Sequence, residues 1–194
     1  MSEIAESRQI KWWVELLDVE RLRHTLLAAF LPSPRPDFLE HPVLDEGEAD
    51  ALEQIGMRPW QEVSLGTIEA HGRMAIYAFD EIELVYYCPA FLNSYLELIS
   101  GSEVSFAREQ NVFDLLCTLF TPPMDEEIGR STTWIIASRL DEEQRRTVAE
   151  IMEVAYSRMD DGDESIEWGR EFWKSPQSFG ADYVRHTHCE EGGN

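Results

Sequence analysis

The residues best suited to bind a metal ion lie at the end of the chain. His186, His188 and Cys189 stand close together there, and Glu190 and Glu191 follow directly. Imidazole and thiolate groups suit zinc, and alternate side chains of an extended segment can share one ion. No second group of ligands stands at zinc-finger spacing, however, and chain termini are usually poorly ordered. We therefore predict a tail without a metal site, and no cofactor.

Residues 160–167 look at first like a calcium-binding loop, because Asp160, Asp161 and Asp163 surround a glycine. Their oxygen ligands and the glycine do not have the spacing of an EF-hand, and no glutamate falls at the required last position. The segment instead predicts an acidic turn at the end of a helix.

Three pairs of side chains have a spacing that acid–base chemistry could use. A carboxylate near an imidazole can orient the ring for proton transfer. No nucleophile or third group accompanies these pairs, so the first two are expected to be surface ion pairs and the last to be charge at a helix start. We predict no catalytic residues. The pairs are Glu20 with His24, Glu69 with His71, and Glu81 with Glu83.

The chain also lacks the common motifs of enzymes. It contains no phosphate-binding loop, nucleophile elbow, dinucleotide fingerprint, Cys-x-x-Cys pair or His-Glu-x-x-His sequence. This absence lowers the prospect of an enzyme without excluding one.

The net charge limits the partners that the chain could bind. Its 194 residues include 38 acidic and 16 basic side chains, which give a formal net charge of -22. A field of this sign repels nucleic-acid phosphates and anionic lipid surfaces, so neither nucleic acid nor membrane is an expected partner. It attracts basic proteins, and we expect a basic protein partner or a second copy of the chain.

The sequence also predicts a cytoplasmic protein. Cys88 and Cys117 lie in apolar helical runs, where thiols behave as small hydrophobic groups, and three cysteines are too few for a disulfide framework. The N-terminus lacks the positive and apolar regions of a signal peptide, and no apolar run approaches the ~18 residues of a membrane span.

Apolar residues recur at steps of three and four through most of the chain, which predicts an all-α fold. Hydrophobic residues make up 43% of the sequence, enough for a substantial core. We predict one compact helical domain over residues 1–174 and a flexible tail over 175–194. A short extended piece is expected near 132–138, where Trp134-Ile135-Ile136 is aromatic and β-branched. Helices are expected at residues 10–17, 18–30, 46–55, 64–71, 80–100, 106–120, 141–159 and 166–173, the last interrupted by a glycine.

The densest apolar stretch runs from Asp80 to Gly101 and is expected at the centre of the core. Asp80 and Glu83 have the form of a capping box that starts a helix. Pro89 lacks the N–H that a helix interior needs, so we predict two helical pieces, the second beginning at this proline. Gly101 is expected to end the second piece in a left-handed conformation.

Within this stretch, Tyr86-Tyr87-Cys88-Pro89-Ala90-Phe91-Leu92 resembles the Tyr-Tyr-Leu-Pro-Ala-Phe/Tyr-Leu motif of a family of uncharacterised bacterial proteins, the domain of unknown function numbered six-seven-one-four. The resemblance spans about residues 21–159, and Cys88 departs from the family's leucine. The resemblance implies a small bacterial helical protein, and it implies no reaction, because the family has no established chemistry. Other residues of the family's pattern occur in the same order along this chain: Phe30, Ala49, Ile55, Trp60, Leu65, Phe79, Leu140 and Gln144.

The first functional hypothesis is therefore a non-catalytic interaction protein, of the immunity or antitoxin type, whose acidic surface meets a basic partner. The alternative is a metal-dependent hydrolase that uses His and Asp/Glu side chains brought together by folding. A third possibility is a homodimer in which N-terminal segments containing Trp12 and Trp13 exchange contacts.

Overall fold

The computed structural model describes residues 18–31, 33–36, 45–101, 104–124, 131–159 and 164–174. These residues form α-helices around one hydrophobic core, with no β-strand among them, so the predicted all-α fold is confirmed. None of the described helices is long and apolar enough to cross a bilayer. The predicted helix at 10–17 and the predicted tail at 175–194 lie outside the described residues.

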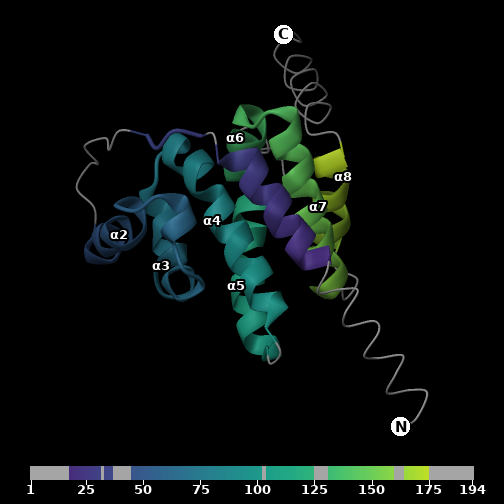
Figure 1. Ribbon diagram of the computed structural model, residues 1–194, viewed down its shortest axis with the longest axis horizontal. Coiled ribbons are helices and arrows are strands. Elements are labelled where there is room, and N and C mark those ends of the chain that lie inside the picture. The colour runs from purple at the N-terminus through teal and green to yellow at the C-terminus, as the bar shows by residue number, and fades with distance from the viewer. Residues whose placement is uncertain are drawn as a thin grey trace, which may run out of the picture.

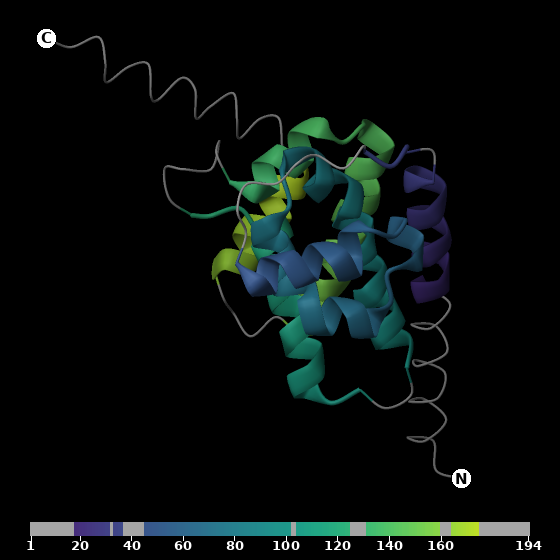
Figure 2. The ribbon, with the colours of Figure 1, turned by 90° about the vertical axis from the view of Figure 1, so that its left-hand side faces the viewer.

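The helices form an elongated assembly (Figure 1). α4 and α5 lie in the middle, α2 and α3 at one end, and α7 and α8 at the other; Figure 2 shows the molecule from the α2 end. The chain is helical over residues 18–30 and continues with α2 (Glu46–Ala51), the π-helix η1 (Leu52–Gly56), the 3-10 turn η2 (Trp60–Glu62), α3 (Leu65–Ala78), α4 (Glu81–Ser100), α5 (Phe106–Phe120), α6 (Thr132–Arg139), α7 (Glu142–Met159) and α8 (Glu164–Lys174).

The central helix α4 begins as its sequence predicts. The Oδ1 atom of Asp80 accepts hydrogen bonds from the backbone N–H groups of Ile82 and Glu83, both at 2.8 Å, and Glu83 Oε2 accepts from the Asp80 N–H at 3.0 Å. The capping box therefore satisfies three backbone donors that the first turn leaves without helical partners. A second capping box starts α7, between Asp141 and Gln144, whose spacing in the sequence is the same as that of Asp80 and Glu83.

The predicted break at Pro89 is wrong, because α4 runs unbroken from Glu81 to Ser100. Proline removes one helical hydrogen bond, but its neighbours Cys88, Ala90 and Leu92 are fully buried. Packing on every side of this segment outweighs the local cost of the proline. Gly101 then ends the helix with φ of -70°, so the predicted left-handed stop is also wrong.

The extended piece predicted near 132–138 is α-helix α6. The Ser131 hydroxyl accepts the backbone N–H of Trp134 at 3.2 Å and so caps the helix, and Ile136 is fully buried on its inner face. Capping and burial therefore override the strand preference of these residue types.

Two other helices are longer or more regular than predicted. The helix expected at 64–71 begins at Leu65 and continues to Ala78 as α3. α8 passes through Gly169 without interruption.

Gly169 matters because α8 packs very closely on α7 there. A Cβ atom at this position would stand 2.2 Å from the hydroxyl oxygen of Tyr156. That tyrosine is buried, and its hydroxyl lies 2.9 Å from Thr121 Oγ1, so its ring has little room to move. The indole of Trp173 donates to the carbonyl of Phe120 at 2.6 Å. α8 is thus fixed to both α7 and the end of α5.

We predict that Gly169→Ala lowers the free energy of unfolding by about 1–3 kcal/mol, because the methyl group must displace the Tyr156 ring. Gly66→Ala in α3 is the control, since a Cβ there would meet only Ser64 Oγ, at 3.9 Å. The control should leave stability unchanged or slightly higher, because alanine favours helix. Urea denaturation of both variants checks this, and equal stabilities would contradict the close packing.

Candidate functional site

Glu20 and His24, expected to form a surface ion pair, do not pair with each other. Glu20 Oε1 instead lies 3.5 Å from Arg23 Nη1, and His24 is exposed. No described carboxylate therefore orients the His24 ring.

The predicted pair of Glu69 and His71 is also divided between two other partners. Arg108 on α5 holds the Glu69 carboxylate through two nitrogens, one of them at 2.8 Å, and this hydrogen bonding keeps the pKa of Glu69 below its usual value. His71 Nδ1 lies 3.1 Å from Asp50 Oδ2 on α2. Both contacts join neighbouring helices.

Glu81 and Glu83 have structural roles as well. Glu83 closes the capping box of α4, and Glu81 forms an ion pair with Arg139 on α6. Among the described residues, no three His, Cys, Asp or Glu side chains lie close enough together to hold a metal ion. His186, His188 and Cys189 and the start of the acidic turn, residues 160–163, lie outside the described part.

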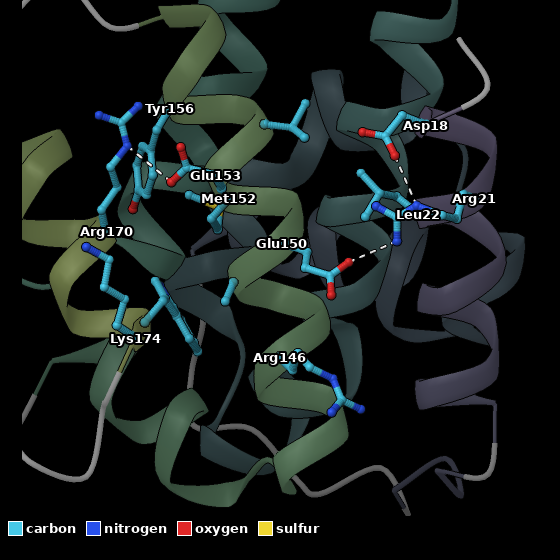
Figure 3. Close-up of a pocket in the computed structure, with 13 residues that line it drawn as sticks. Asp18, Arg21, Leu22, Arg146, Glu150, Met152, Glu153, Tyr156, Arg170 and Lys174 are labelled. Atoms are coloured by element: carbon cyan, nitrogen blue, oxygen red, sulfur yellow. Dashed lines mark hydrogen bonds and ion pairs between the residues drawn. The ribbon is translucent and has the colours of Figure 1, made fainter. Parts of the chain in front are cut away.

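A groove of about 580 Å³ lies between the helix at residues 18–30, α7 and α8 (Figure 3). Its deepest apolar side chains are Leu22, Met152, Tyr156 and Trp173, all of them buried. Its remaining lining includes seven charged side chains: Asp18, Arg21, Arg146, Glu150, Glu153, Arg170 and Lys174.

Most of the charges in the groove are paired with one another. Arg21 lies 3.0 Å from Asp18 and 3.1 Å from Glu150, and the bond to Glu150 is the main reason that the pKa of Arg21 is raised. On the other side of α7, Arg170 Nε lies 3.2 Å from Glu153 Oε2. The dashed lines in Figure 3 mark these contacts. The two walls are therefore attached to α7 by ion pairs, and these pairs engage Asp18, Glu150 and Glu153.

The end of the molecule away from α8 has a different charge balance. Residues 45–62 hold one basic side chain, Arg58, and six acidic ones, which we call the acidic face: Asp45, Glu46, Glu48, Asp50, Glu53 and Glu62. Figure 2 shows α2, the first helix of this face, toward the viewer.

Three of the six carboxylates of the acidic face have no ion-pair partner among the described residues. Glu46, Glu53 and Glu62 are exposed, and none of them forms an ion pair with any described residue. The contrast with the groove is direct, since Glu150 and Glu153 there each face an arginine. The α2 end therefore carries three exposed carboxylates that no described arginine or lysine pairs with.

A buried tyrosine anchors the turn in the middle of the acidic face. The Tyr87 hydroxyl lies 2.7 Å from the carbonyl oxygen of Gly56 and 2.8 Å from that of Arg58, and its single hydrogen is shared between them. Arg35 Nη2 also donates to the Gly56 carbonyl, at 2.8 Å. Burial raises the pKa of Tyr87 to about 12, so the hydroxyl stays protonated as a donor. Met57, between the two carbonyls, is 59% exposed.

No protein-family model, curated protein or solved structure matches the chain. The resemblance of residues 86–92 to the six-seven-one-four family therefore stays a prediction. All seven of these residues are buried, and burial raises the pKa of the Cys88 thiol, so this cysteine is an unreactive part of the core. Apart from the Tyr87 hydroxyl, the side chains of residues 86–92 are packed in the core.

A buried ion pair elsewhere provides a comparison for the groove. Glu109 on α5 is 7% exposed, accepts from Arg158 Nε at 2.7 Å and Nη2 at 3.2 Å, and accepts from the Tyr95 hydroxyl at 3.2 Å. Removal of the arginine would leave a buried carboxylate without its main counter-charge.

We predict that Arg158→Ala lowers the free energy of unfolding by about 2–4 kcal/mol. The matched change Arg21→Ala in the groove should cost less than about 1 kcal/mol, because that arginine and its partners are largely exposed. Urea denaturation of the two variants gives the comparison. A larger loss for Arg21→Ala would mean that the groove pairs, and not the buried pair, hold the helices together.

Proposed function

We propose that this chain is a non-catalytic protein–protein interaction module whose acidic face binds a basic surface of another protein. The observation that supports this proposal is the unneutralised charge of Glu46, Glu53 and Glu62 at one end of the molecule. The overall charge of -22 adds a long-range attraction for the same partners.

The physics of such a surface suits an inhibitor of the immunity or antitoxin type. Complementary fields accelerate encounter and favour one orientation of the two proteins. Salt screens charges beyond a Debye length of about 8 Å at physiological ionic strength, so binding should weaken as salt is added. Catalysis is not needed for this role, because occupation of the partner's surface is itself the effect.

The experiment uses the immobilised full chain to capture partners from native lysate at low and at high salt. We expect a basic protein to be retained at low salt and released at high salt. The triple variant Glu46→Gln, Glu53→Gln and Glu62→Gln should then bind the purified partner about tenfold more weakly, since three exposed charge pairs together contribute on the order of 1–2 kcal/mol.

The control changes the net charge by the same amount away from the acidic face. Glu142, Glu143 and Glu164 are exposed on α7 and α8, and their replacement by glutamine should alter affinity by about twofold or less. Recovery of no protein at either salt concentration would contradict the proposal. Equal weakening by the two triple variants would show that total charge, and not the acidic face, governs binding.

A further inference from the structure

The groove between the helix at residues 18–30, α7 and α8 opens beside Asp18, the first residue that the structure describes (Figure 3). We propose that residues 10–17 of the same chain lie across this groove as a strap and cover it. The strap ties the helix at 18–30 to α8 across α7. The acidic face lies at the other end of the molecule (Figure 1), so this inference does not depend on the proposed function.

The composition of residues 10–17 indicates that they need a covering surface. Six of these eight residues are apolar: Ile10, Trp12, Trp13, Val14, Leu16 and Leu17. The two adjacent indoles carry a large apolar area, and apolar clusters of this kind mark contact sites when they lie on a surface. The segment is therefore expected to pack against another part of a protein.

The phase of the apolar pattern changes where the segment joins the helix. Leu22 and Leu26 mark the buried side of the helix, whereas Trp13 and Leu17 mark the apolar side of the segment. Because a helix turns about 100° per residue, one straight helix would place these two sides on roughly opposite faces. A bend just before Asp18 removes this conflict and lets the apolar side of the segment face the groove.

The segment is long enough to reach from Asp18 across α7 to α8. The helix at 18–30 and α8 both pack on α7, where the ion pairs described above join them. Packed helix axes are about 8–10 Å apart, so the distance across the groove is roughly 16–20 Å. Eight residues span about 12 Å as a helix and about 26 Å as an extended chain. The distance falls between these two lengths, so the segment bridges it when one end is extended.

The groove offers the segment both apolar and charged contacts. Ala149 and Val154 of α7 line the groove and are only half-buried, so an apolar strap would cover them. Arg146 is exposed in the same lining and forms no ion pair with any described residue. Glu15 of the segment supplies a carboxylate that this arginine can bind.

Charge favours the segment of the same chain over that of a second copy. Each copy carries a formal net charge of -22, so two copies repel each other. A segment joined covalently at Asp18 is already present at an effective concentration on the order of millimolar. It covers the groove without bringing two acidic chains together.

Photo-crosslinking from the groove identifies the segment that covers it. The amino acid p-benzoylphenylalanine replaces Ala149 in the full chain, and equal amounts of unlabelled and heavy-nitrogen-labelled protein are mixed before irradiation. We expect an adduct between position 149 and residues 10–17 of the same copy, which mass spectrometry recognises because both peptides carry one isotope. Position 70 is the control, because Ala70 is exposed on α3 at the other end of the molecule. An adduct of mixed isotopes, an adduct with residues 175–194, the same adduct from position 70, or no adduct would each overturn the proposal.

Trypsin measures whether the strap is docked in the unaltered chain. A docked segment must open before it is cut, so the rate of cleavage after Lys11 follows the open population. We expect Ala149→Glu and Leu17→Asp each to accelerate this cleavage about tenfold, because each places a carboxylate in an apolar contact. Ala70→Glu, with the same change of charge, should leave the rate unchanged. Leu17 lies outside the described helices, so Leu17→Asp keeps the test decisive if Ala149→Glu weakens their packing. Equal rates for Leu17→Asp and the unaltered chain would overturn the proposal.

Discussion

The hydrogen bonds of the Tyr87 hydroxyl connect the centre of the fold to its surface. The hydroxyl belongs to the most buried helix, α4, and binds the carbonyls of Gly56 and Arg58 in a turn about thirty residues earlier in the chain. Gly56 is buried and its carbonyl also accepts from Arg35, so the tyrosine and the arginine together hold the path of the turn. The backbone on both sides of Met57 is held by these contacts.

The large negative charge is distributed unevenly over this scaffold. Where helices meet, carboxylates face arginines, as Glu109 faces Arg158 and Glu150 faces Arg21. These pairs reduce repulsion inside the molecule, and removal of one partner of the buried pair is the costlier change. At the α2 end, Glu46, Glu53 and Glu62 have no such partners among the described residues and remain exposed. The carboxylates that join helices are thus distinct from Glu46, Glu53 and Glu62, which we propose for recognition.

Local sequence signals predicted much of the fold, because capping and apolar spacing act over a few residues. The boxes at Asp80 and Asp141 and the buried face of α7 follow directly from them. Pro89 and Trp134-Ile135-Ile136 were predicted wrongly, since tertiary burial overrides local preference there. The turn at Met57 could not be predicted, because no sequence pattern shows which distant carbonyls a tyrosine hydroxyl will bind.

Hydrogen exchange in a Tyr87→Phe variant tests most directly whether α4 holds this turn. The amides of Arg58, Glu62 and Val63 are hydrogen-bonded within it, and the amide of Thr121, bonded to Cys117 at the end of α5, is the internal control. The account predicts exchange about tenfold faster at the three turn amides and unchanged at Thr121. Unchanged exchange in the turn, or equal acceleration at all four amides, would contradict it.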